Sequence, residues 1–258
     1  MGALSPFELA ALLAGAVVAG FVQGLSGFAF SMVSMALWVW VLDPKLAAVM
    51  AVFGALVGQL IGLFTVPRRL AWRELAPFVL GGLAGIPLGV GLLPRLDAEV
   101  FKFGVGALLV VACPAMLFAS RLPRAGIRSP TLARGADALA GVGGGVMGGL
   151  GGFTGVVPTL WCTLRGMDKA AQRSVVQNFN LATLAVTMLA YAASGAVTRP
   201  MWPLLPLVAA AVLVPSLIGA RFYHRLSEQS FRRVVLGLLT AAGAVMLVAA
   251  APRVLQGG

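Results

Sequence analysis

The stretch QGLSGF at residues 23–28 and the stretch GGLGGF at residues 148–153 decide how this chain is expected to fold. Each glycine cluster lies inside a long apolar run, 7–41 in the first case and 131–164 in the second. A straight helix of about 35 residues would extend roughly 50 Å, whereas the hydrocarbon core of a bilayer is roughly 30 Å thick. Glycine lets a backbone turn back or unwind. We therefore expect each run to break at its glycines and to form a hairpin with arms of about fifteen residues.

The composition is that of a polytopic membrane protein. Of the 258 residues, 60% are hydrophobic and 10% are charged, and the mean hydropathy is +0.97. A soluble domain has about a quarter of its residues charged. Besides the two hairpins, which we place at 6–42 and 130–165, six stretches have the length of ordinary transmembrane helices. These six are 45–66, 75–93, 100–119, 169–193, 202–221 and 230–251.

The basic residues indicate the orientation of the chain. If each long run enters and leaves the membrane on one side, fourteen of the nineteen Lys and Arg residues fall on one side of the membrane. Cytoplasmic loops are enriched in positive residues, so we expect that side to be the cytoplasm and both termini to lie outside it. The fourteen are Arg68, Arg69, Arg73, Arg121, Arg124, Arg128, Arg134, Arg165, Lys169, Arg173, Arg221, Arg225, Arg232 and Arg233.

The two halves of the chain repeat each other. Ser5 and Ser129 each precede a proline and are expected to cap the first helix of a hairpin. Asp43 and Asp168 are 125 positions apart, as the glycine clusters are, and each is expected to cap the helix after its hairpin. With a hairpin and three transmembrane helices in each half, the second half begins on the side opposite to the first. The expected fold is all-α with two inverted-topology repeats. The first repeat is 1–122 and the second is 123–258.

The two hairpin tips are the expected binding site. Broken backbone inside a bilayer has to be buried in protein or line a cavity, and two tips that approach from opposite sides would meet. The outgoing helices would begin near Phe28 and Phe153, and helix N-termini attract anions. No Lys or Arg lies within the apolar interior of any span, so we expect an anion to be held by amides, hydroxyls and backbone alone. The candidate residues are Gln23, Gly24, Ser26, Gly27, Phe28, Gly149, Gly151, Gly152, Phe153, Thr154, Gln177, Asn178 and Asn180.

The amide side chains within the span at 169–193 have two possible roles. Gln177, Asn178 and Asn180 form the most polar stretch within a span, and buried amides in lipid either join helices or contact a substrate. The tip glycines likewise serve either a functional break or close helix packing. The first half offers only Gln59 on its corresponding helix, so the site should be lopsided towards the second half.

Several functions are disfavoured by the residues. The acidic residues, Asp137 among them, lie near loops or helix caps, and we find no intramembrane set for acid, base or metal chemistry. We therefore expect no enzyme, no metal and no cofactor. Basic residues are not interleaved with aromatic ones as a nucleic-acid surface requires. The expected partners are a small anion and the lipid bilayer, while a coupling proton or sodium ion and a homodimer are left open.

The motif GGLGGFTGVVPTL at 148–160, with Pro158, and its first-half counterpart QGLSGFAFSMVSMAL at 23–37 resemble the TauE/SafE family of sulfite exporters and related anion permeases. The first-half copy differs from the family pattern by having Ser26 at a glycine position and Ser34 near the proline position. The resemblance implies transport of small sulfur-containing or carboxylate anions, such as sulfite, sulfoacetate or another organosulfonate. Together with the expected inverted repeats, it leads us to expect a multi-pass secondary transporter of the bacterial cytoplasmic (inner) membrane that works by alternating access around a midplane site formed by the two hairpin tips. A passive anion channel and a transporter of a small carboxylate are the alternatives.

Overall fold

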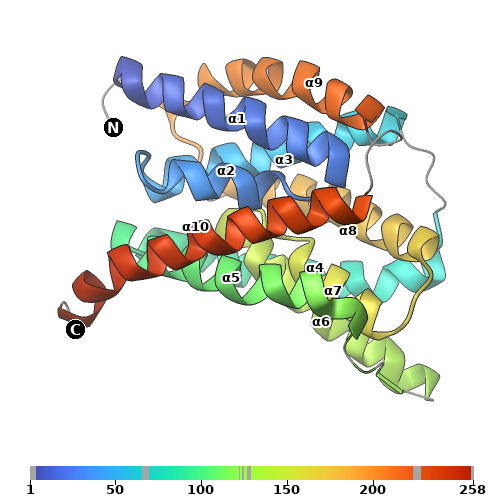
Figure 1. Cartoon of the computed structure of the whole chain (residues 1–258). Helices are drawn as coiled ribbons and strands as arrows, with labels where there is room; N and C mark the ends of the chain where they lie inside the picture. Colours follow the sequence, from blue (N-terminus) through green and yellow to red (C-terminus); the bar gives the residue numbers. More distant parts are fainter. Residues whose placement is uncertain are drawn as a thin grey trace.

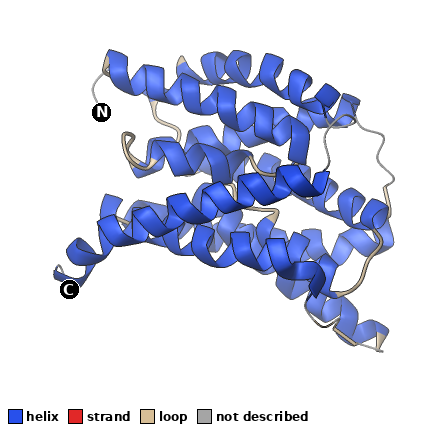
Figure 2. Ribbon diagram, viewed as in Figure 1, coloured by secondary structure: helices blue, strands red, loops and turns tan. Residues whose placement is uncertain are grey.

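The computed structural model describes residues 4–65, 70–121, 123, 125–126, 129–222 and 228–256, and within them it contains helices and no strands (Figures 1 and 2). These residues contain ten α-helices and three short 3-10 turns, joined by loops. The helices are α1 (Pro6–Ser26), α2 (Phe30–Trp38), α3 (Pro44–Thr65), α4 (Trp72–Leu92), α5 (Ala98–Phe118), α6 (Pro130–Gly151), α7 (Val156–Leu164), α8 (Lys169–Ala193), α9 (Leu204–Phe222) and α10 (Glu228–Gln256); the 3-10 turns are η1 (Leu93–Arg95), η2 (Ala119–Arg121) and η3 (Arg199–Met201).

Both long apolar runs break at a glycine, as expected. Gly27 ends α1 with φ +83°, and Gly152 ends α6 with φ +79°; both are in the left-handed region that favours glycine. After each break the chain folds back into a helix of nine residues, α2 or α7. The two breaks are 125 positions apart, which is the spacing of the sequence repeat.

The expectation of equal arms was wrong. Helices α1 and α6 have 21 and 22 residues and are therefore about 32 Å long, whereas the return arms have nine residues each. The helix continues past Gly20 and Gly24 because α9 packs closely against these positions: a Cβ on Gly24 would collide with the Ser216 backbone. Here the glycines favour helix contact rather than a break, and the chain turns only at Gly27.

Among the residues that the structure describes, seven helices are long and apolar enough to cross a membrane. Six of them are the expected spans, and the seventh is α1, the first arm of the first hairpin. The protein is therefore a multi-pass membrane protein. The seven candidate spans are Pro6–Ser26, Pro44–Phe64, Trp72–Arg95, Ala98–Phe118, Lys169–Ala193, Arg199–Phe222 and Arg233–Arg253.

The helices pack in pairs that join the two halves of the chain. Helix α1 packs along α9, α6 along α4, and α5 along α10. In the α4–α6 pair, glycines spaced four apart on each helix allow backbone to touch backbone, as in close-packed membrane helices. These are Gly81, Gly85 and Gly89 on α4 and Gly141, Gly145 and Gly149 on α6, and a Cβ on any of them would overlap the facing helix.

The expected N-caps are present. Ser5 forms a capping box with Glu8, and Ser129 accepts a hydrogen bond from the Leu132 amide. Asp43 accepts bonds from the amides at the start of α3, and Asp168 does so at the start of α8. Helix starts after each hairpin are thus fixed by matching carboxylates.

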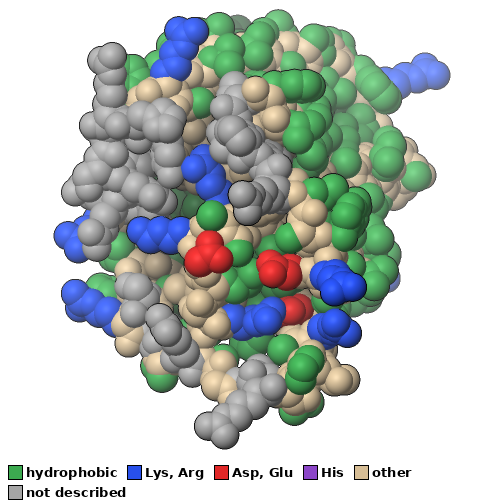
Figure 3. Space-filling view, turned by 90° about the vertical axis from the view of Figure 1, so that its right-hand side faces the viewer, with side chains coloured by type: hydrophobic (Ala, Val, Ile, Leu, Met, Phe, Trp, Pro, Cys, Tyr) green, Lys and Arg blue, Asp and Glu red, His purple; other side chains and the backbone are tan. Residues whose placement is uncertain are grey.

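Both chain termini lie at the same end of the bundle (Figure 1). At the opposite end, Lys and Arg side chains gather and acidic ones are fewer (Figure 3). We call this the basic end; α3 and α9 finish there, and α4 and α8 begin there (Figure 1). Five of the fourteen basic residues that we assigned to this side lie outside the described residues: Arg68, Arg69, Arg124, Arg128 and Arg225.

Candidate functional site

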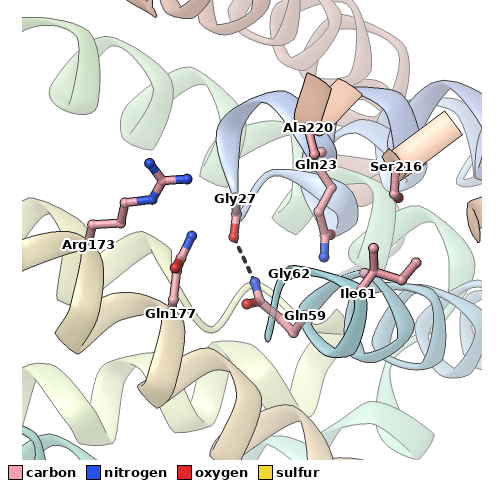
Figure 4. Close-up of a pocket in the computed structure, with 11 residues that line it drawn as sticks. Gln23, Gly27, Gln59, Ile61, Gly62, Arg173, Gln177, Ser216 and Ala220 are labelled. Atoms are coloured by element: carbon pink, nitrogen blue, oxygen red, sulfur yellow. Dashed lines mark hydrogen bonds between the residues drawn. The ribbon is translucent and has the colours of Figure 1, made fainter. Parts of the chain in front are cut away.

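A pocket lies beside the tip of the first hairpin, between α1, α3, α8 and α9 (Figure 4). Its unoccupied space is about 340 Å³, part of it open to solvent. Four of the expected site residues line it, namely Gln23, Gly24, Gly27 and Gln177, and Gln59 lies among them. The remaining lining residues are Gly58, Ile61, Gly62, Arg173, Ser216 and Ala220.

Gln23 crosses from α1 to the backbone of α3. Its Nε2 donates a hydrogen bond to the Ala55 carbonyl oxygen at 2.9 Å. The absence of a side chain at Gly58 makes this possible, because a Cβ there would overlap the Gln23 amide. Gln23 is 3% exposed, and its Oε1 is buried without a hydrogen-bond partner. The NH₂ group of this amide therefore holds the hairpin to α3, and its oxygen is left without a hydrogen bond.

Gln59 and Gln177 lie on either side of the tip. Gln59 Nε2 donates to the carbonyl oxygen of Gly27 at 2.7 Å, which fixes the residue at the break (Figure 4). The Gln177 amide lies close to Gly27, since a Cβ built on Gly27 would be 2.7 Å from its Nε2. Gln177 is 5% exposed, and its Oε1 is also buried without a partner. A glycine at the break thus leaves room for an amide from α8.

Arg173 corrects the expectation of a site without positive charge. It lies in α8, inside the helix expected at 169–193, and it is half-buried and lines the pocket. Arg173 lies one helical turn before Gln177, so both side chains reach towards Gly27 from the same face (Figure 4). The four-residue spacing of Arg173 and Gln177 is visible in the sequence, but we had counted Arg173 only among the basic residues of the cytoplasmic side and had not included it in the site.

Ser26 and Phe28 do not line the pocket. Ser26 Oγ accepts hydrogen bonds from the Phe28 amide at 3.5 Å and the Ala29 amide at 3.3 Å. The hydroxyl therefore stabilises the turn itself, which is the common role of a serine at a break. Phe28 packs against the hydrophobic core.

The second tip is closed by packing. Thr154 Oγ1 donates to Asn180 Oδ1 at 2.9 Å, and the two residues are 1% exposed. Tyr191 on α8 donates its hydroxyl to the Gly149 carbonyl oxygen at 2.8 Å. Among the amides on α8, Asn180 therefore joins helices, and Asn178 is half-buried and does not line the pocket.

The remaining second-tip residues pack in the core. A Cβ on Gly152 would be 2.5 Å from Ser31 Oγ, and one on Gly151 would be 2.9 Å from the Met35 methyl group. Phe153 is 4% exposed. The structure thus brings only part of the predicted site together, at the first tip.

A buried ion pair holds the two arms of the second hairpin. Asp137 on α6 is 3% exposed, pairs with Arg165 Nη1 at 2.6 Å, and accepts a hydrogen bond from Trp161 Nε1 at 2.7 Å. We had placed Asp137 near a helix cap, whereas it is two turns inside α6. Because the carboxylate has both a charge partner and a neutral donor, its role is to hold α7 against α6.

Comparison with known proteins gives one result. Residues 12–246 match the family described as Sulfite exporter TauE/SafE. Neither the curated protein sequences nor the solved structures contain a match to this chain.

Proposed function

The chain belongs to the sulfite exporter TauE/SafE family, and on this premise we propose that it is a secondary transporter of sulfite or an organosulfonate. Membership in the family indicates membrane transport of sulfite-like anions, and the family match across most of the chain is the observation that carries the proposal. The pocket at the first tip adds a site of suitable chemistry, with an arginine and three amides around a break in a helix.

We further propose that the two halves are inverted repeats, with boundaries near residue 122. The packing supports this assignment, because exchanging the halves turns the α1–α9 pair into α6–α4 and leaves α5–α10 unchanged. The tips support it at the level of single residues. Gly27 faces Gln177, and Gly152 faces Val52, so both contacts are related by the same offset of 125 positions.

In this proposal, α1–α2 and α6–α7 are re-entrant hairpins that enter from opposite sides. The first tip borders an open pocket and the second tip is packed shut, which is the arrangement of a transporter that is open to one side. Transport would then proceed by opening the second tip as the first closes. The excess of basic residues opposite the termini favours a bacterial cytoplasmic membrane with both termini in the periplasm.

The pocket residues have distinct proposed roles. Arg173 supplies the charge that attracts the anion, and its planar guanidinium offers a fork of donors to sulfur-bound oxygens. Gln177 contacts the substrate beside the break at Gly27. Gln23 and Gln59 fix the hairpin tip against α3, and Gln23 also offers its free amide oxygen to the substrate.

Flux in proteoliposomes tests the proposal. The purified protein should catalyse uptake of radiolabelled sulfite that saturates with concentration and is accelerated by unlabelled sulfite on the opposite side. Protein-free liposomes give the background. Absence of protein-dependent flux of sulfite and of organosulfonates would overturn the proposal, and flux with neither saturation nor acceleration would identify a channel.

A further inference from the structure

The amide oxygen of Gln23 needs a hydrogen-bond donor that the described residues do not supply. Oxygen and nitrogen of a side-chain amide are assigned from their partners. Here the partner of Nε2 is the Ala55 carbonyl oxygen, which can only accept, so the opposite end has to be the oxygen. That oxygen is buried and unpaired. A buried acceptor without a donor is costly, so this atom favours a ligand that donates.

The amide oxygen of Gln177 also has no hydrogen-bond donor, but here the orientation of the amide is not determined by a partner. Its amide is buried beside Gly27, its oxygen has no partner, and nothing forces its orientation. It can therefore turn to present either the oxygen or the NH₂ group to a ligand. Arg173, one turn away, brings a permanent positive charge to the same pocket.

The charge of Arg173 and the hydrogen-bonding needs of the amides together limit the chemical class of ligand that fits the pocket. A sodium ion would suit two amide oxygens but not the guanidinium of Arg173 beside them. A fully deprotonated oxyanion suits the guanidinium but offers no proton to Gln23. An anion that also carries an O–H or N–H group satisfies both. Candidates of this class are hydrogensulfite and alkanesulfonates with a hydroxyl group.

We propose that the pocket at the first tip selects a singly charged sulfur oxyanion that bears a hydrogen-bond donor, with its charge at Arg173 and its donor at the Gln23 amide oxygen. This inference rests on the proposed transport function and specifies the substrate class of the same site. Gln23 is then a specificity-determining residue, and Arg173 determines affinity for the whole class.

Two sulfonates of equal charge and similar size separate the two contributions. Hydroxyethanesulfonate (isethionate) carries a hydroxyl where propanesulfonate carries a methyl group. Wild-type protein in detergent should bind hydroxyethanesulfonate about tenfold more tightly, the factor expected for one hydrogen bond to a buried acceptor. Isothermal titration of each ligand gives the ratio of dissociation constants. A wild-type ratio near one overturns the inference whatever any variant does.

Substitutions at Gln23 and Arg173 show which residue produces the ratio of the two dissociation constants. Gln23→Met keeps the length of the side chain without its oxygen, so the ratio should fall to about one. The variant also loses the bond to the Ala55 carbonyl oxygen, and the resulting change in the tip affects both sulfonates alike. Both ligands are measured on the same preparation, so partial loss of folded protein cancels from the ratio. Arg173→Gln should weaken both ligands about tenfold or more and leave the ratio unchanged.

Matched controls lie outside the pocket. Gln172 directly precedes Arg173 on α8, and its amide donates hydrogen bonds to the Thr159 carbonyl oxygen and to Thr163 Oγ1. Gln172→Met should leave the ratio at its wild-type value. Arg73 on α4 is exposed at the basic end, so Arg73→Gln should not alter either affinity.

The outcomes distinguish the inference from the function on which it rests. If wild-type protein transports sulfite and binds both sulfonates equally, water satisfies Gln23, and the inference fails while the function stands. If sodium chloride, compared with choline chloride, raises the unfolding temperature without sulfonate and Gln23→Met removes that effect, the oxygen binds a cation and the inference fails. If no sulfur anion binds or is transported, the proposed function fails.

Discussion

Replacing Gly27 with alanine separates the two roles of the break. The first role is conformational: φ is +83°, and an L-residue in the left-handed region costs about 1–2 kcal/mol. The second role is spatial, because the new Cβ would be 2.7 Å from Gln177 Nε2. To reach ordinary contact, the amide would have to withdraw by about 0.7 Å. That movement is cheap for the end of a flexible side chain, so it should alter binding rather than stability.

Gly195 provides the matched control. It follows α8 with φ +72°, and a Cβ there would meet no atom within 4 Å. Gly195→Ala therefore carries the conformational cost alone. We expect both substitutions to lower the thermal unfolding temperature by a similar few degrees, because each destabilises the fold by about 1–2 kcal/mol. Only Gly27→Ala should weaken substrate binding, by about tenfold, because only it moves a pocket amide.

Thermal unfolding in detergent and titration with sulfite measure the two effects on the same preparations. A Gly27→Ala protein with wild-type affinity for sulfite would refute the placement of Gln177 in the site. A Gly195→Ala protein with equally weakened binding would show that backbone strain, and not the displaced amide, controls affinity.

Three further predictions test the fold around the site. Asp137→Asn should lower the free energy of unfolding by about 2 kcal/mol, as measured by thermal unfolding. This is less than the loss expected on breaking a fully buried ion pair, because Arg165 stays partly solvated. The same change at Asp168 should have little effect, because Asn also caps helices. Gly145→Ala should abolish stable folded protein in size-exclusion chromatography, since the Cβ would overlap the α4 backbone, whereas Gly104→Ala in open space should not. Reporters that work only in the cytoplasm should be inactive at both termini, and an active reporter at either end would contradict the proposed orientation.

The sequence predicts most of the architecture for physical reasons that are local. Apolar length predicts the spans, serine and aspartate predict the helix starts, and the glycine clusters predict the two breaks. The offset of 125 positions relates Gly27 to Gly152, and in the structure these two residues end α1 and α6 and break the two long apolar runs. Each of these features depends on the chain within a few residues, so no knowledge of the tertiary contacts is needed.

The errors concern features that tertiary contacts decide. A glycine that packs against another helix and a glycine that turns the chain look alike in sequence, so the hairpin arms were assigned equal lengths. The helix start at Lys169 placed Arg173 inside α8, where its neighbours determine whether it faces solvent or the pocket. Asp137 was misjudged because its partner, Arg165, lies 28 positions away and meets it only when the hairpin closes.

The two hairpin tips have similar backbone conformations but different side chains around them. The position equivalent to Gln177 is Val52, and Val52 is the residue that faces Gly152 at the second tip. A pocket opened there by symmetric motion would therefore present a methyl group where the first tip presents an amide. Arg173 likewise corresponds to Ala48 at the same offset. In the proposed alternating-access mechanism, the affinity for an anion should therefore be higher in the state that opens to the basic end.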